Sequence, residues 1–269
     1  MLSTVLTRAA LPLLAAGLLL GGCAKPSAPS PAAGPLPAAP DAAAPHAGPH
    51  AGPPAGPNAA PHAGPPAADR AGPAGLPGLG PRTGELVPDG TRQALLVRGR
   101  STNSSESTAT LYERDGENRW RAVAGPWPAR NALKGWTDEH WAGDHRTPIG
   151  VFGLTDAGGR LPDPGTRLPY HQSEEFVAVG TGFRGESLRG SFDYVVAINY
   201  NRESGLTPLD ERRPMGWDRG GGVWIHVDHD GPTQGCISLD LDRMAELLRR
   251  LDPGKRPVVV MGDGESLAR

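Results

Sequence analysis

"GVWIHVDHDGPTQGCISLDLDRMAELLRRLDPGKRPVVVMG", residues 222–262, carries the clearest run of structural signals in this sequence. Its aliphatic segments predict a strand at each end and a third, short strand after the central cysteine. Between them, "LDRMAELLRRL" has apolar residues at helical spacing, so we expect one helix that begins after Asp240 and ends at the Asp-Pro-Gly sequence 252–254. The expected apolar face of that helix consists of Leu241, Met244, Leu247, Leu248 and Leu251.

The first strand of this stretch, 222–228, alternates between aliphatic and other side chains. Successive side chains of a strand point to opposite faces, so we expect its valines and isoleucine to face the core and His226 to face a groove. The polar turn "DHDGPTQG" that follows would return the chain as in a hairpin and bring Cys236 alongside His226. We expect His229 to be a solvated residue of that turn.

Five further runs of strand-forming residues lie upstream, each bounded by Gly, Pro or Asp. An Asp115-Gly116 pair between the second and third runs predicts a hairpin turn. Segment 158–190 is rich in glycine and charge, which is typical of a lid or binding loop. These signals predict a mainly β domain over 83–262, followed by a frayed tail at 263–269. The five runs are 93–99, 108–114, 120–125, 149–154 and 194–200.

Residues 1–22 predict a signal peptide. Arg8 supplies its positive charge, and its apolar run 9–22 is shorter than the roughly 20 residues that span a bilayer. The run ends in "LLGGC", which resembles a bacterial lipobox, where the signal is removed before a cysteine that carries lipid. We therefore expect a lipid anchor at Cys23 that holds the exported protein on the outer face of the cytoplasmic membrane, facing the cell wall. The alternative is an ordinary secretory signal in which Cys23 is incidental.

Residues 23–82 predict a disordered tether between the lipid and the domain. The segment consists mainly of Ala, Pro and Gly with a few histidines, and "APHAGP" occurs in it twice. It contains no Val, Ile, Met or aromatic residue, so it cannot build a hydrophobic core. Such a tether suits a lipid-anchored domain that works at a distance from its membrane.

The net charge and the cysteine content limit the classes of function that this protein can have. The net charge is −2 and there is no dense basic block, which excludes nucleic acid as a partner because phosphate binding requires clustered Lys and Arg. Cys23 and Cys236 are the two cysteines of the chain. If Cys23 carries lipid, Cys236 has no partner within the chain, and a lone thiol in an oxidising compartment indicates chemistry rather than packing.

Cys236 and His226 form the candidate catalytic pair. A cysteine nucleophile needs an adjacent imidazole that accepts its proton. Gly235 precedes the cysteine, where a glycine permits a tight turn with amide N–H groups facing a substrate carbonyl. Zinc is the alternative, because two histidines, an aspartate and the cysteine within 226–236 are possible ligands, but their spacing matches no structural zinc pattern. We expect neither a metal nor another cofactor.

Two motifs together resemble a known family. "IHVDHDGPTQGCISL" is similar to the signature of the L,D-transpeptidase catalytic domain, the YkuD-like fold, in which a strand-borne histidine precedes a Ser/Thr-x-Gly-Cys block. "GDHRTPIGVF", residues 143–152, is similar to the Thr-Pro-x-Gly-x-Phe segment of that family. The closing "LLRRLDPGKRPVVVMG" resembles an actinobacterial-type lipoprotein branch. The resemblance covers roughly 90–262 and implies a β-sandwich or barrel-like fold.

This resemblance implies a transferase that acts on peptidoglycan stem peptides. Cys236 would attack the carbonyl between the third residue and the terminal D-alanine, with His226 as the general base. A thioester would form, D-alanine would leave, and an amine of a second stem would resolve the thioester as a 3→3 cross-link. Amides near Gly235 and Cys236 would form the oxyanion hole. The further candidate substrate-binding residues are Gln234, Thr233, Arg146 and Tyr200.

Three departures from the family pattern leave the balance between transpeptidation and hydrolysis open. Gln234 stands where many members have histidine, Ser238 where many have Arg or Asn, and the spacing from His226 to Cys236 is short. The alternatives are an L,D-carboxypeptidase and a catalytically degenerate wall-binding lipoprotein. Papain-like wall peptidases place the cysteine before the histidine, and sortases place the histidine far upstream, so neither class fits.

Overall fold

Short aliphatic segments form strands throughout the computed structural model, which describes residues 74–269. The predicted signal peptide, the predicted lipidation site Cys23 and most of the predicted tether lie outside the described residues. Strands of the main sheet are β1 (Gln93–Gly99), β2 (Glu106–Arg114), β3 (Trp120–Arg130), β6 (Gly150–Gly153), β7 (Ala157–Gly159), β8 (Tyr170–Gln172), β9 (Val195–Ala197), β10 (Trp224–Val227), β11 (Ile237–Leu239) and β12 (Val258–Asp263). The remaining elements are strands β4 (Trp136–Thr137) and β5 (Thr147–Pro148), helices α1 (Pro81–Glu85), α2 (Leu241–Arg250) and α3 (Gly264–Leu267), and 3-10 turns η2 (Trp217–Arg219) and η3 (Pro253–Lys255).

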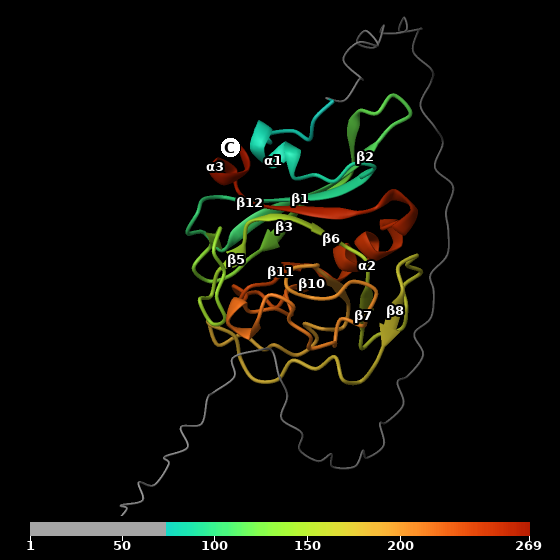
Figure 1. Ribbon diagram of the computed structural model, residues 1–269. Coiled ribbons are helices and arrows are strands. Elements are labelled where there is room, and N and C mark those ends of the chain that lie inside the picture. Colours follow the sequence, from blue (N-terminus) through green and yellow to red (C-terminus); the bar gives the residue numbers. More distant parts are fainter. Residues whose placement is uncertain (1–73) are drawn as a thin grey trace, which may run out of the picture.

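The main sheet has ten strands in the order β6-β12-β1-β2-β3-β11-β10-β9-β7-β8, with both parallel and antiparallel neighbours. In Figure 1, β1 and β12 cross the upper part of the domain, β10 and β11 lie below them, and α2 stands beside both. The prediction of a mainly β fold with one clear helix near the C-terminus is therefore confirmed. Among residues 74–269, no helix is long and apolar enough to cross a membrane.

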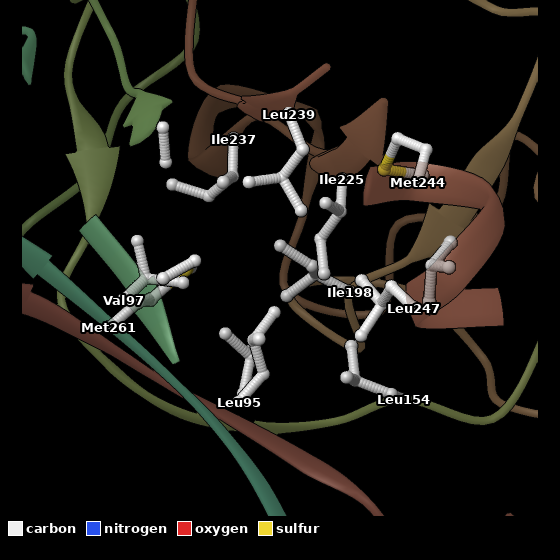
Figure 2. Packing of buried hydrophobic residues seen from close by; sticks show 14 of the residues in the cluster. Leu95, Val97, Leu154, Ile198, Ile225, Ile237, Leu239, Met244, Leu247 and Met261 are labelled. Carbon is white, nitrogen blue, oxygen red and sulfur yellow. The ribbon is translucent and has the colours of Figure 1, made fainter. Parts of the chain in front are cut away.

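The core fills the space between these two parts of the sheet (Figure 2). Aliphatic side chains of β1 and β12 meet those of β10 and β11, and α2 closes the cluster with its apolar face. A sheet whose strands contribute to one shared core in this way buries its alternate residues on the inner face. Figure 2 labels Leu95, Val97, Leu154, Ile198, Ile225, Ile237, Leu239, Met244, Leu247 and Met261.

Helix α2 confirms the predicted apolar face except at its first residue. Met244, Leu247, Leu248 and Leu251 are fully buried, and Asp240 is the N-cap residue as expected. Leu241 is 42% exposed, because the helix begins there beyond the edge of the core. The same helix therefore carries a buried leucine and an exposed leucine, and the effects of replacing each by alanine can be compared directly.

We expect Leu247→Ala to lower the free energy of unfolding by about 2–5 kcal/mol, because a fully buried leucine loses its contacts and leaves a cavity. Leu241→Ala in the first turn of the same helix should lower it by less than about 1 kcal/mol. Urea unfolding of the two variants beside the wild type measures both values. Equal losses in the two variants would contradict the packing described here.

The ends of the described chain lie differently from the prediction. Residues 263–269 do not fray: Asp263 accepts hydrogen bonds from the first amides of α3, and Leu267 is fully buried. Residues before 83 also belong to the fold, since Leu76 packs in the same small cluster as Leu267 and the Gly80 amide donates to the Leu267 carbonyl at 2.9 Å. The tail holds because it covers apolar residues of β1 and β12 that would otherwise face water.

The hairpin expected at Asp115-Gly116 is confirmed, since β2 and β3 pair antiparallel around it. The Asp115 carboxylate accepts from the amides of Glu117 and Arg119 at 2.9 Å each, which fixes the turn. The residue with a left-handed backbone is Asn118, at φ 60°, rather than Gly116.

Candidate active site

Strands β10 and β11 place His226 and Cys236 on the same face of the sheet. The expected alternation is confirmed, because the aliphatic residues of β10 lie in the main core while Trp224 packs with Cys236 in a second cluster. The expected hairpin is wrong: β10 and β11 run parallel, with Ile225 beside Ile237. The chain therefore crosses back between the strands, and Cys236 lies beside Trp224, two positions before His226 along the strand pair.

Cys236 is a buried thiol at the start of β11, with 6% of its surface exposed. Its Sγ accepts from the Trp224 amide at 3.4 Å and donates to the Gly222 carbonyl at 3.6 Å. The Thr233 hydroxyl donates to the Cys236 carbonyl at 2.6 Å. The turn before β11 is thus held on both sides of the sulfur.

His226 is buried, and the surrounding contacts define its tautomer. Its Nδ1 lies 2.8 Å from the Val227 carbonyl oxygen, which can only accept, so Nδ1 carries the proton and donates. Burial lowers the pKa of His226 to about 4, because the charged ring loses its hydration. The ring is therefore neutral at physiological pH, with Nε2 as a proton acceptor.

This low pKa makes folding stability depend on pH. The unfolded chain binds a proton at His226 near the ordinary pKa of about 6.5, whereas the folded chain does so only near 4, so acid favours the unfolded state in between. From pH 7 to pH 5, we expect this residue alone to remove about 2 kcal/mol of stability. Urea unfolding at both pH values should show a smaller decrease for His226→Gln than for the wild type. An identical decrease would contradict the burial of a neutral imidazole.

A cavity of about 280 Å³ opens beside this pair. Cys236 and His226 line one wall, and the opposite wall comes from the segment 177–192. Phe192 joins the two walls, since its ring lies edge-on to His226 at 5.6 Å between centroids and to Trp224 at 5.0 Å. Most of this segment falls within the stretch whose glycine and charge predicted a binding loop.

The expectation that His229 is a solvated residue of the turn is wrong. Its side chain forms part of the cavity wall. Its side chain is 6% exposed, and its ring stacks almost parallel to His226, with 5.7 Å between centroids. Its Nδ1 lies 3.3 Å from the Glu186 carboxylate. The sequence alone does not point to Glu186 or Phe192, because both are far from the motif along the chain. Only the fold of the loop brings them to it.

The candidate substrate-binding residues divide into two groups. Thr233 and Gln234 line the cavity with the Cys–His pair, although the Thr233 hydroxyl is engaged by Cys236. Arg146 points elsewhere, since its guanidinium donates to the Trp136 carbonyl at 3.0 Å and to the Asn103 side chain at 3.1 Å. It therefore does not line the cavity.

Tyr200 and Gly235 support the site from behind. Tyr200 is buried and donates to the Arg219 carbonyl at 2.8 Å, so it positions the segment that leads to β10 rather than bordering the cavity. Gly235 has no left-handed backbone. A Cβ there would lie 3.5 Å from the Arg146 carbonyl oxygen, an ordinary contact distance. The tight turn expected at this glycine is not required by its conformation.

Ser238, one of the departures from the family pattern, has a clear partner. Its hydroxyl donates to one oxygen of Asp228 at 2.8 Å, and the guanidinium of Arg130 donates to the other at 3.0 Å. Arg130 lies on β3 directly beside Ser238. Arg130 and Asp228 line a second cavity and not the one that Cys236 lines, so Ser238 takes part in an ion-pair network of the scaffold.

The residues considered as zinc ligands do not form a metal site. Within the described range 74–269, no three His, Cys, Asp or Glu side chains are grouped so that they hold a metal ion. His226 and His229 instead stack, and Asp228 is bound by Ser238 and Arg130. The arrangement that remains is a thiol and a neutral imidazole on one cavity wall.

A comparison with protein families identifies the class of this domain. The profile of the YkuD family, the L,D-transpeptidase catalytic domain, matches residues 102–260, which include β10, β11 and the cavity. The chain belongs to this family, and membership supports an L,D-transpeptidase-type activity in general. No curated protein and no solved structure matches the chain significantly.

Proposed function

We propose that this protein is a cysteine L,D-transpeptidase that releases D-alanine from tetrapeptide stems of peptidoglycan and forms 3→3 cross-links. The observation that carries the proposal is that the thiol of Cys236 and the neutral imidazole of His226 line the same cavity, within a domain of this family. The cavity of about 280 Å³ is of a size for a few residues of a stem peptide rather than a folded substrate.

In the first half-reaction, Nε2 of His226 accepts the thiol proton of Cys236. The sulfur attacks the carbonyl carbon between the third residue and D-alanine and forms an S–C bond. The tetrahedral intermediate collapses as its C–N bond breaks, and the imidazolium returns the proton to the leaving amine. D-Alanine departs and a thioester remains on Cys236.

In the second half-reaction, an amine from the third residue of another stem attacks the thioester carbonyl. Nε2 of His226 accepts the proton of this amine, an amide bond forms, and the C–S bond breaks. The sulfur takes back the proton from the imidazolium, which restores the thiol. Water in place of the amine gives a shortened stem and no cross-link.

We favour transpeptidation over hydrolysis because of the chemical character of the cavity walls. Its lining is mainly apolar, with Val177, Phe183 and Phe192 among the contributing residues. Apolar walls disfavour bound water near a thioester. An L,D-carboxypeptidase activity is the second candidate, because Gln234 lines the cavity where many relatives have an imidazole.

We further propose that Cys23 carries a lipid and that the protein works from the outer face of the cytoplasmic membrane. The support is the "LLGGC" sequence after a short apolar run. Metabolic labelling with a radioactive fatty acid tests this directly. Label in the wild type and none in Cys23→Ala is the expected result, and label in neither would remove the anchor from the proposal.

Incubation of the purified protein with disaccharide-tetrapeptide tests the proposed reaction. We expect equal amounts of D-alanine and cross-linked dimer, measured by chromatography and mass spectrometry. D-Alanine with tripeptide monomer alone would identify a carboxypeptidase. Absence of both products, with no acylated protein by intact mass, would leave the wall-binding alternative.

A further inference from the structure

Two large aromatic side chains outside the cavity lining, Trp141 and Trp217, are exposed. Trp141 is 47% exposed and Trp217 is 58% exposed, while the other four tryptophans at 120, 127, 136 and 224 are buried. Exposed tryptophans on an otherwise well-buried set are unusual, because each leaves a large apolar area in water. Nothing in the proposed cysteine chemistry uses either ring.

The two tryptophans come from neighbouring loops. The Ala142 amide donates to the Asp218 carbonyl at 2.9 Å, and these residues directly follow Trp141 and Trp217 in the chain. The backbones that carry the two indoles are therefore joined by a hydrogen bond. We refer to the surface formed by Trp141, Trp217 and the arginines over them as the tryptophan surface.

Buried polar groups fix the tryptophan surface from below. Asn201 is 4% exposed, and its side chain accepts from the Met215 amide at 2.7 Å and donates to the Gly216 carbonyl at 2.9 Å. The Asp144 carboxylate accepts from the Trp141 amide at 2.9 Å. A backbone held by such contacts is preorganised for a ligand, so less conformational freedom is lost on binding.

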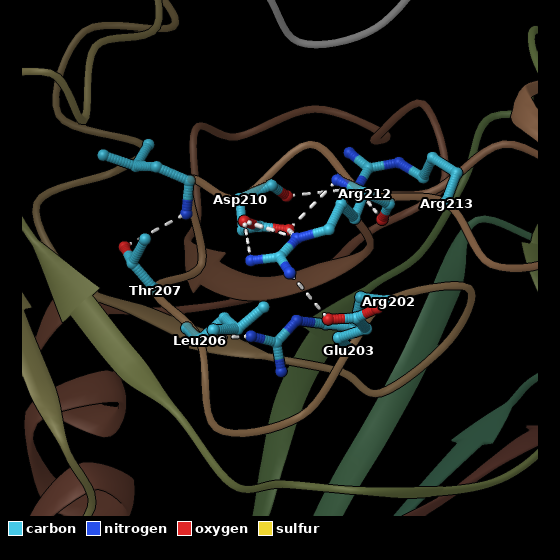
Figure 3. Close-up of polar contacts among 8 residues, drawn as sticks. Arg202, Glu203, Leu206, Thr207, Asp210, Arg212 and Arg213 are labelled. Carbon is cyan, nitrogen blue, oxygen red and sulfur yellow. Dashed lines mark hydrogen bonds and ion pairs between the residues drawn. The ribbon is translucent and has the colours of Figure 1, made fainter.

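A guanidinium lies over each ring. The Arg219 carbon is 4.4 Å from the Trp141 ring centre, and that of Arg213 is 5.5 Å from the Trp217 ring centre. Arg213 donates to the carbonyl of Asp210, in a loop tied together by the Asp210–Arg212 ion pair that Figure 3 shows. The tryptophan surface thus combines apolar ring faces with hydrogen-bond donors.

The loops that carry the tryptophan surface contact residues of the candidate active site. His145, four residues after Trp141, lies edge-on to Phe183 of the cavity wall with 5.1 Å between ring centres. On the other loop, Gly222 follows Trp217 by five residues and its carbonyl accepts from the Cys236 thiol at 3.6 Å. The tryptophan surface therefore lies on loops that adjoin the cavity wall and the catalytic cysteine.

We propose that the tryptophan surface binds the glycan strand to which the stem peptide is attached. This inference rests on the proposed function, which places the stem in the cavity. A sugar ring has an apolar C–H face that packs on an indole, and its hydroxyl and N-acetyl oxygens accept hydrogen bonds from a guanidinium. A neutral, amphipathic polymer fits alternating rings and arginines better than an acidic or a purely apolar ligand does.

Isothermal titration calorimetry of the full chain with stem-free glycan strands tests the proposal. We expect the wild type to bind, and the double variant Trp141→Ala/Trp217→Ala to bind at least about tenfold more weakly. Leu241→Ala, which removes an exposed apolar side chain from α2, should bind like the wild type. Thermal unfolding of each variant establishes that it is folded before titration.

The result that overturns the proposal is equal binding by the wild type and the double variant, or no binding by either. Binding of an extracted wall protein but not of stem-free glycan would likewise overturn it in favour of a protein ligand. Cys236→Ala separates this inference from the proposed function, since it should bind glycan normally and release no D-alanine. D-Alanine release by that variant would reject the thiol mechanism while leaving the glycan measurement valid.

Discussion

Cys236→Ser should reduce D-alanine release by about 10⁶-fold, the order of loss seen when a nucleophile that acts in a coupled set is removed. A hydroxyl holds its proton far more tightly than a thiol, so the imidazole of His226 generates far less of the attacking anion from serine than from cysteine. The measurement is release of D-alanine from disaccharide-tetrapeptide, followed by intact mass for any acylated protein.

The serine variant keeps the fold because a hydroxyl accepts from the Trp224 amide and donates to the Gly222 carbonyl as the thiol does. Its unfolding transition should therefore match that of the wild type within about 1 kcal/mol. Activity within tenfold of the wild type would place the nucleophile elsewhere in the chain.

His226→Gln should lower D-alanine release by about 10²–10⁴-fold, the usual contribution of a positioned general base. Glutamine has an N–H that replaces the donation from Nδ1 to the Val227 carbonyl, but it has no basic nitrogen that accepts the thiol proton. Single-turnover release, compared with the wild type at pH 7, gives the size of the effect.

His171→Gln is the matched control, because His171 is an exposed residue of β8 whose ring bonds to Thr207 and which does not line the cavity. Its rate should equal that of the wild type. If the variants at 171 and 226 lose activity equally, the loss comes from general destabilisation and His226 is not the base.

Much of the site was predictable from short-range patterns. Alternation in β10 separates His226 from the aliphatic residues that enter the core, and this depends only on the two-residue period of a strand. The helical spacing of α2 predicts three turns of apolar contact, failing only at Leu241, where the core ends. Such features follow from neighbouring residues and need no knowledge of the rest of the fold.

Long-range pairing was not predictable in the same way. The sequence between His226 and Cys236 is compatible with a hairpin, and only competition among all ten strands places β11 between β3 and β10 in a parallel pairing. The position of His229 depends on Glu186, more than 40 residues upstream, so its burial has no local signal. Arg146 and Tyr200 have suitable chemistry for a substrate site, but their hydrogen bonds commit them to the scaffold.

In the parallel pairing of β10 with β11, the length of the connecting segment does not set the position of the thiol relative to the imidazole. In a hairpin it would. In a hairpin, the length of the turn sets which residues face one another, so an insertion moves the thiol relative to the imidazole. Here hydrogen bonds between Ile225 and Ile237 and their neighbours set that alignment, and the crossing segment 228–236 only has to span it. The number of residues between His226 and Cys236 can therefore vary without a change in the alignment of the strands. The short spacing in this chain is compatible with an unchanged reaction geometry.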